Sequence, residues 1–213
     1  MVHGRRMIQL DIGTVKYPYY APMTTADKLT ASRLVLAPVF FAVYRFGAAL
    51  PSVPYVAILW GLFFLIEISD LFDGFAARSS GTVSDFGKLF DPYADVFARL
   101  TYFTCFALDG IMPAWVFILV LYREFSINFL RLLLVQRGVA MGARPGGKLK
   151  SAIYMVAGAL SLIFVSLARL GLWPAAAAPL SVAIYAVYSL AAVLALASFI
   201  DYSIQFKKIA SRT

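Results

Sequence analysis

The sequence predicts an all-α membrane protein whose helices cross the bilayer several times. Of its 213 residues, 62% are hydrophobic and only 14% are charged, which leaves too little polar surface to cover an ordinary soluble domain. The apolar residues occur in long runs, and a backbone inside lipid can satisfy its hydrogen bonds over such runs as helices of about 20 residues. We therefore predict six transmembrane helices preceded by an interfacial segment.

The first elements are bounded by aromatic and proline residues. Residues 1–28 are mixed in polarity and carry a tyrosine cluster, which is typical of a segment at the membrane interface. The first span is expected near residues 29–50 and the second near 55–68, with prolines in the turn between them. The second helix is expected to continue beyond the hydrocarbon into Asp70 and Asp73.

Turn residues also bound the later elements. Asp109-Gly110 is expected to end the third helix, and Pro113 to open the fourth. Pro145-Gly146-Gly147 is interpreted as a breaker inside a basic loop. The predicted helices are residues 85–108, 113–135, 151–170 and 180–200. The predicted organisation is the interfacial segment 1–28, one membrane domain at 29–204 and a basic tail at 205–213.

The distribution of basic residues predicts the orientation in the membrane. The termini, the turn after the second span and the basic loop hold most of the 19 Lys and Arg residues, whereas the opposite side holds only Arg45 and Arg169. The positive-inside rule then places both termini in the cytoplasm of a multi-pass protein of the cytoplasmic (inner) membrane. The net charge of +8 fits contact with anionic membrane lipids and not with nucleic acid, because the basic residues are scattered among spans.

Four aspartates stand in an otherwise apolar stretch and indicate a metal site. Asp70 and Asp73 are three residues apart, and Asp91 and Asp95 are four apart, so each pair shares one face of a helix. Ionised carboxylates at membrane depth are costly and need partners. Oxygen ligands favour a hard divalent cation, so we predict Mg²⁺ or Mn²⁺. The single histidine, His3, lies in the polar N-terminus, which excludes histidine-based metal chemistry.

The aspartates belong to a longer motif, D-x2-D-G-x2-A-R-x8-G-x3-D-x3-D, between Asp70 and Asp95. This stretch resembles the signature of the CDP-alcohol phosphotransferases, and the chain length and six expected spans fit that family. The resemblance implies the fold of that family, an enzyme of phospholipid biosynthesis that uses CDP-diacylglycerol, and a homodimer. It also implies two metal ions held by all four aspartates, with Asp95 acting as general base. The active site would then lie at the cytoplasmic ends of the second and third helices.

The remaining motif positions are expected to bind CDP-diacylglycerol. Small residues would let the nucleotide approach the backbone closely, and the arginine can grip a phosphate with two hydrogen bonds. A threonine at the entry to the first span joins them, because residues 27–33 resemble the N-x2-T-x2-R segment of phosphatidylglycerophosphate synthases, with Asp27 in place of Asn. The predicted CDP-diacylglycerol contacts are Thr30, Gly74, Ala77, Arg78 and Gly87.

Other segments also resemble phosphatidylglycerophosphate synthases. They are residues 90–95, Arg123-Glu124 through Arg131, and residues 147–151, although Val96 replaces the usual Lys and Ser151 the usual Thr. The resemblance implies transfer of a phosphatidyl group from CDP-diacylglycerol to glycerol 3-phosphate, with release of CMP. The predicted acceptor-phosphate contacts are Arg123, Arg131, Lys148 and Lys150.

Several of these residues also have simpler interpretations. The two lysines could be positive-inside residues only, and Arg123 could form a buried pair with Glu124. Arg99 is expected to brace Asp95. Glu67 is interpreted as interfacial, with a supporting role beside the site as the alternative. Serine, inositol phosphate or an amino-alcohol are alternative acceptors. A cation transporter is an alternative class, although the chain shows no inverted repeat or pair of broken helices.

Overall fold

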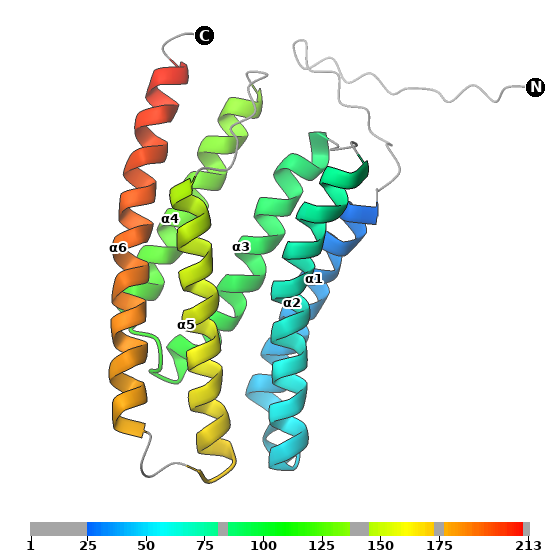
Figure 1. Ribbon diagram of the computed structural model, residues 1–213, viewed down its shortest axis with the longest axis vertical. Helices are drawn as coiled ribbons and strands as arrows, with labels where there is room; N and C mark the ends of the chain where they lie inside the picture. Colours follow the sequence, from blue (N-terminus) through cyan, green and yellow to red (C-terminus); the bar gives the residue numbers. More distant parts are fainter. Residues whose placement is uncertain (1–24, 81–84, 137–144, 173–176, 211–213) are drawn as a thin grey trace, which may run out of the picture.

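The computed structural model describes residues 25–80, 85–136, 145–172 and 177–210. Within these ranges the chain folds into long α-helices and one short 3-10 helix, without a strand (Figure 1). The all-α prediction is therefore confirmed. The elements are α1 (Thr25–Phe46), η1 (Gly47–Ala49), α2 (Ser52–Ser80), α3 (Asp85–Leu108), α4 (Ala114–Gln136), α5 (Pro145–Arg169) and α6 (Ala177–Ala210).

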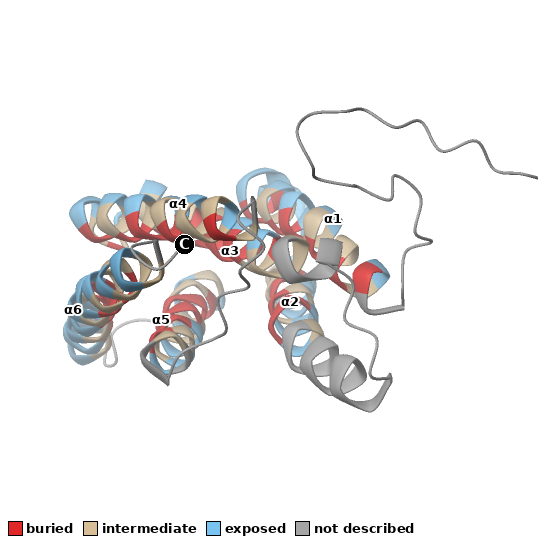
Figure 2. Ribbon diagram, turned by 90° about the horizontal axis from the view of Figure 1, so that it is seen from above, coloured by how far each residue is buried: buried red, intermediate tan, exposed pale blue. Residues whose placement is uncertain are grey.

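The helices lie side by side along one long axis, with α3 in the middle of the bundle (Figures 1 and 2). Helix α3 contacts α1, α4 and α5, while α5 also packs against α6 and α2. The C-terminal end of α2 and the N-terminal end of α3 lie at the upper end of Figure 1, together with the C-terminal ends of α4 and α6. This end carries both halves of the aspartate motif.

Four of the helices are long and apolar enough to cross a membrane, and the chain is a multi-pass membrane protein. These candidate spans are Asp27–Ala49, Ser52–Ser69, Leu149–Arg169 and Ala178–Ile209. Helices α3 and α4 are of similar length, but charged residues stand within their apolar stretches, at Arg99 in α3 and at Arg123 and Glu124 in α4. These three charged side chains are buried inside the bundle.

Aromatic residues of α3 fill the core between the neighbouring helices. Tyr102 and Phe103 are fully buried, and the Phe103 ring meets the rings of Tyr154 and Tyr188 edge-on at centroid distances of 5.6 and 5.8 Å. Gly158 of α5 makes this packing possible, because a Cβ at this position would lie 3.0 Å from the Phe63 ring and 3.1 Å from the Tyr102 ring. Helices α2, α3 and α5 therefore meet closely just beyond the site.

The helix boundaries confirm most of the sequence predictions. Asp109-Gly110 ends α3, and Gly110 adopts a left-handed φ of 72° that glycine accepts at little cost. The interpretation of Pro145-Gly146-Gly147 as a breaker was wrong, because α5 begins at Pro145. Proline suits the first turn of a helix, where its missing N–H has no partner to lose. Helix α6 continues to Ala210, well past the expected end of the sixth span.

Candidate active site

Asp91 and Asp95 lie one turn apart on α3, and each carboxylate is contacted by an arginine. Arg33 of α1, which is fully buried, donates from Nη2 to Oδ1 of Asp91 at 3.1 Å. Arg99 donates from Nη1 to Oδ2 of Asp95 at 3.0 Å, which confirms that it braces this carboxylate. The Asp91 side chain is 45% exposed and that of Asp95 is 24% exposed. Both carboxylates are thus oriented from inside the protein while remaining open to solvent.

The entry to α1 turns its polar side chains inward. Asp27, Thr30 and Arg33 are all buried, and their spacing of three residues places them on one face of α1. Because α1 packs against α3 and Arg33 contacts Asp91, this face is directed toward the aspartates of α3. The role of Thr30 in binding CDP-diacylglycerol stays a prediction.

The other half of the motif lies at the end of α2. The side chains of several predicted site residues are outside the described part of the structure: Asp70, Asp73, Gly74, Ala77, Arg78, Gly87 and Lys148. Among the side chains that are described, no group of three or more possible metal ligands gathers, so the four-carboxylate cage stays a prediction. The donor type does fit, because Asp91 and Asp95 offer carboxylate oxygens on one face of α3, as hard divalent cations prefer.

Glu67, one turn before the motif, is an unexpected member of the site. It is 7% exposed, accepts a hydrogen bond from the Tyr102 hydroxyl at 3.0 Å, and forms an ion pair with Arg99 at 3.6 Å. The interfacial interpretation was therefore wrong, because its charge has partners inside the protein. Arg99 also donates to the Ser151 hydroxyl at 3.0 Å. Its guanidinium thus links α2, α3 and α5 beside Asp95.

The structure brings three of the predicted acceptor contacts together around one carboxylate and one tyrosine. Arg123 contacts Glu124 at 2.8 Å, which confirms the buried pair, and Lys150 donates to the other oxygen of Glu124. Arg131 donates to the Tyr202 hydroxyl at 2.9 Å, and the guanidinium groups of both arginines lie over the Tyr202 ring.

Two of these cations, Arg123 and Lys150, are buried, and Arg131 is partly buried. Lys150 is only 5% exposed, so it is not merely a surface charge that orients the protein. Arg123 also donates to the Ser198 hydroxyl of α6. No local sequence pattern marks Tyr202, so it was not among the predicted site residues. Glu124 was not among them either, although it stands next to Arg123 in the sequence.

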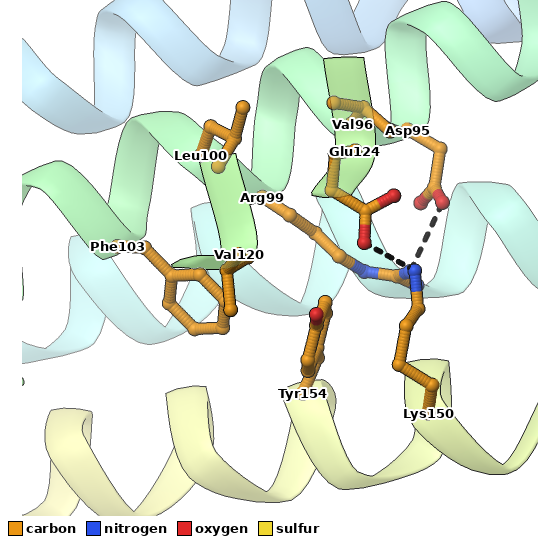
Figure 3. Close-up of a pocket in the computed structure, with 9 residues that line it drawn as sticks. All are labelled: Asp95, Val96, Arg99, Leu100, Phe103, Val120, Glu124, Lys150 and Tyr154. Carbon is orange, nitrogen blue, oxygen red and sulfur yellow. Dashed lines mark hydrogen bonds and ion pairs between the residues drawn. The ribbon is translucent and has the colours of Figure 1, made fainter. Parts of the chain in front are cut away.

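A pocket connects the predicted base with the cation cluster (Figure 3). Side chains of α3, α4 and α5 point into it, and the ion pairs of Asp95 with Arg99 and of Glu124 with Lys150 face each other. Its lining consists of Asp95, Val96, Arg99, Leu100, Phe103, Val120, Glu124, Lys150 and Tyr154. The pocket therefore has the partly exposed carboxylate of Asp95 on one side and the buried ammonium of Lys150 on the other.

Comparison with known proteins identifies the family. The family model for CDP-alcohol phosphatidyltransferase matches residues 23–196. The chain therefore belongs to the CDP-alcohol phosphatidyltransferase family. This family membership makes it an enzyme, as the motif predicted, and sets aside the alternative of a cation transporter.

Individual relatives of this phosphatidyltransferase resemble it along most of its length. It is 40% identical over 205 residues to a CDP-diacylglycerol–glycerol-3-phosphate 3-phosphatidyltransferase of Treponema pallidum, which covers 90% of this chain and 94% of the relative. It is 34% identical over 177 residues to a probable phosphatidylglycerophosphate synthase of Mycobacterium tuberculosis, covering 83% and 78%. A 3-phosphatidyltransferase of Bacillus subtilis is 32% identical over 140 residues, covering 62% and 72%.

Proposed function

We propose that this enzyme transfers the phosphatidyl group of CDP-diacylglycerol to glycerol 3-phosphate and releases CMP. The names of the relatives support this reaction. The observation in the structure that carries the choice of acceptor is the cluster of Arg123, Arg131 and Lys150, which reaches the pocket of Asp95 through Lys150.

The cation cluster suits an acceptor that carries a phosphate. Its three cations outnumber the Glu124 carboxylate, and a phosphate monoester carries a charge of about −1.5 to −2 at neutral pH. The Nε atom of Arg131 is buried and has no hydrogen-bond partner among the described residues, so a donor remains for an acceptor oxygen. An uncharged alcohol or serine would leave buried positive charge without compensation.

In the proposed reaction, Asp95 accepts the proton of the attacking acceptor hydroxyl while Arg99 holds its carboxylate in place. The acceptor oxygen forms a bond to the phosphatidyl phosphorus, and the bond from that phosphorus to the CMP oxygen breaks with its electron pair. Divalent ions bound by Asp70, Asp73, Asp91 and Asp95 would supply neutralisation of the diphosphate charge. Thr30, Gly74, Ala77, Arg78 and Gly87 are the proposed contacts of CDP-diacylglycerol, and Lys148 is a proposed fourth contact of the acceptor phosphate.

We further propose that the site faces the cytoplasm and that the enzyme is a homodimer. The basis for the orientation is charge: Arg45 and Arg169 are the basic residues expected on the far side. In the structure, both lie near the η1 end of the bundle, where Arg169 donates to the backbone oxygens of Ala48 and Leu50. The homodimer rests on the family resemblance alone.

An acceptor screen tests the proposed reaction. Purified enzyme is given CDP-diacylglycerol and Mg²⁺ with glycerol 3-phosphate, serine or inositol phosphate, and CMP release and the lipid product are measured. We expect phosphatidylglycerophosphate with the first acceptor only. Efficient use of serine or inositol phosphate while glycerol 3-phosphate stays inert would overturn the proposal.

Asp95→Asn is expected to abolish turnover and to retain CDP-diacylglycerol binding, because proton removal is needed only in the transition state.

A further inference from the structure

Tyr154 places a buried hydroxyl without a partner at the active-site pocket. Its side chain is 1% exposed and lines the pocket together with Asp95 and Lys150 (Figure 3). The hydroxyl has no hydrogen-bond partner among the described residues. Burial of such a group without a hydrogen bond costs about 1–3 kcal/mol, so phenylalanine would be the more stable residue at this position.

The lack of a partner distinguishes Tyr154 from the other buried tyrosines that the structure describes. Each of those hydroxyls is hydrogen bonded: Tyr44 to Asp109, Tyr55 to the backbone of Tyr44, Tyr102 to Glu67, Tyr188 to Ser161 and Tyr202 to Arg131. The protein therefore satisfies its buried tyrosine hydroxyls elsewhere. The exception coincides with the pocket.

Two neighbours pack against the ring of Tyr154. Phe103 packs edge-on against it at a centroid distance of 5.6 Å, and the Nζ atom of Lys150 lies 4.7 Å from the ring centroid. These contacts fix the direction of the hydroxyl. It lies near the Glu124 carboxylate, outside hydrogen-bond geometry with it, and in the field of Arg123 and Arg99. A hydroxyl that is oriented in advance can bind a ligand at little cost in side-chain entropy.

We propose that Tyr154 determines acceptor specificity by a hydrogen bond from its hydroxyl to an oxygen of the phosphorylated polyol acceptor. The acceptor would lie between Lys150 and Asp95, with its phosphate toward the cations and its attacking hydroxyl toward the carboxylate. A site built to hydrogen bond a polar substrate group discriminates strongly against analogues that lack it. The inference rests on the proposed function, because it concerns the acceptor of that reaction.

Tyr154→Phe tests this role, with Tyr188→Phe as a matched control. Both changes remove one buried tyrosine hydroxyl, but that of Tyr188 is bonded to Ser161 at 2.9 Å within the bundle. Kinetics with glycerol 3-phosphate and CDP-diacylglycerol are measured together with the thermal unfolding temperature. We expect Tyr154→Phe to raise KM for the acceptor about tenfold, equivalent to about 1.4 kcal/mol. Its KM for CDP-diacylglycerol and its unfolding temperature should be unchanged, or the latter raised.

The control should show the opposite behaviour. Tyr188→Phe should lower the unfolding temperature and leave both KM values unchanged. The inference is overturned if Tyr154→Phe leaves acceptor kinetics unchanged, weakens CDP-diacylglycerol binding instead, or destabilises the protein as the control does. The wild-type acceptor screen is read first. If it selects another acceptor, the proposed function fails, and the Tyr154→Phe kinetics are then measured with that acceptor to judge this inference separately.

Discussion

Replacement of Arg131 by glutamine should weaken acceptor binding more selectively than any other change in the cation cluster. Arg123 and Lys150 are already paired with Glu124, whereas Arg131 contacts only the hydroxyl and ring of Tyr202 among the described residues. Its positive charge is therefore the least compensated. Loss of this side chain should remove a contact to the acceptor phosphate without leaving a buried carboxylate unpaired.

The magnitude follows from the type of contact. A hydrogen bond to a charged group contributes about 1.5–3 kcal/mol, and about 1.4 kcal/mol corresponds to a factor of ten. Arg131→Gln should therefore raise KM for glycerol 3-phosphate by about 10- to 150-fold. Arg131→Lys should lose less, because it keeps the charge and loses the planar fork that grips two oxygens.

Steady-state kinetics with each substrate varied in turn provide the assay. KM for CDP-diacylglycerol should stay nearly constant, since a uniform loss of acceptor binding acts on one substrate only. Arg45→Gln is the control, because Arg45 pairs with Asp109 at the other end of the bundle and should leave acceptor kinetics unchanged. An unchanged acceptor KM for Arg131→Gln, or an equal effect on both substrates, would refute the assignment of Arg131 to the acceptor phosphate.

Three further predictions concern the rest of the site and the bundle. Glu67→Gln should lower the turnover number about tenfold with both KM values nearly unchanged, because Arg99 loses its second carboxylate partner. In a double-mutant cycle with Arg99→Gln, the losses in turnover number should not be additive. Gly158→Ala should lower the free energy of unfolding by about 1–3 kcal/mol, as measured by thermal unfolding, since its methyl group would lie 3.0 Å from the Phe63 ring. Chelation should abolish turnover, and Asp91→Asn should raise the Mg²⁺ concentration needed to restore it.

Each of these predictions has a clear opposite outcome. Fully additive losses for Glu67→Gln and Arg99→Gln would show that Glu67 does not act through the arginine. An unchanged unfolding temperature for Gly158→Ala would mean that the neighbouring rings move aside freely. Turnover that persists in excess chelator would rule out the metal-dependent mechanism.

The helices and the family motif could be predicted because their signals are local. Each of these signals lies within one short segment of the chain: the long apolar runs, Asp109-Gly110 and the exact gaps between the aspartates. The boundary at Pro145 was missed because proline is compatible with both a turn and a first helical turn. Local sequence does not distinguish these two states.

The pairing of side chains between helices could not be predicted in the same way. Glu67 looked interfacial because its partners Tyr102 and Arg99 are on another helix, 35 and 32 residues further along the chain. Tyr202 carries no motif, and its importance comes from the two arginines of α4 that lie over its ring. The choice between a buried pair and a substrate contact for Arg123 likewise depended on which side chains of other helices surround it.

The position of Arg123 and Glu124 near the middle of α4 affects how the protein is made. On insertion scales a charged residue at the centre of a membrane helix costs about 2.5–3.5 kcal/mol, so α4 enters lipid poorly by itself. Groups that satisfy this pair, Lys150 on α5 and Ser198 on α6, are synthesised later. We therefore expect stable integration of α4 to await the last two helices, and a nascent chain that stops before Lys150 to leave the Arg123–Glu124 pair incompletely satisfied.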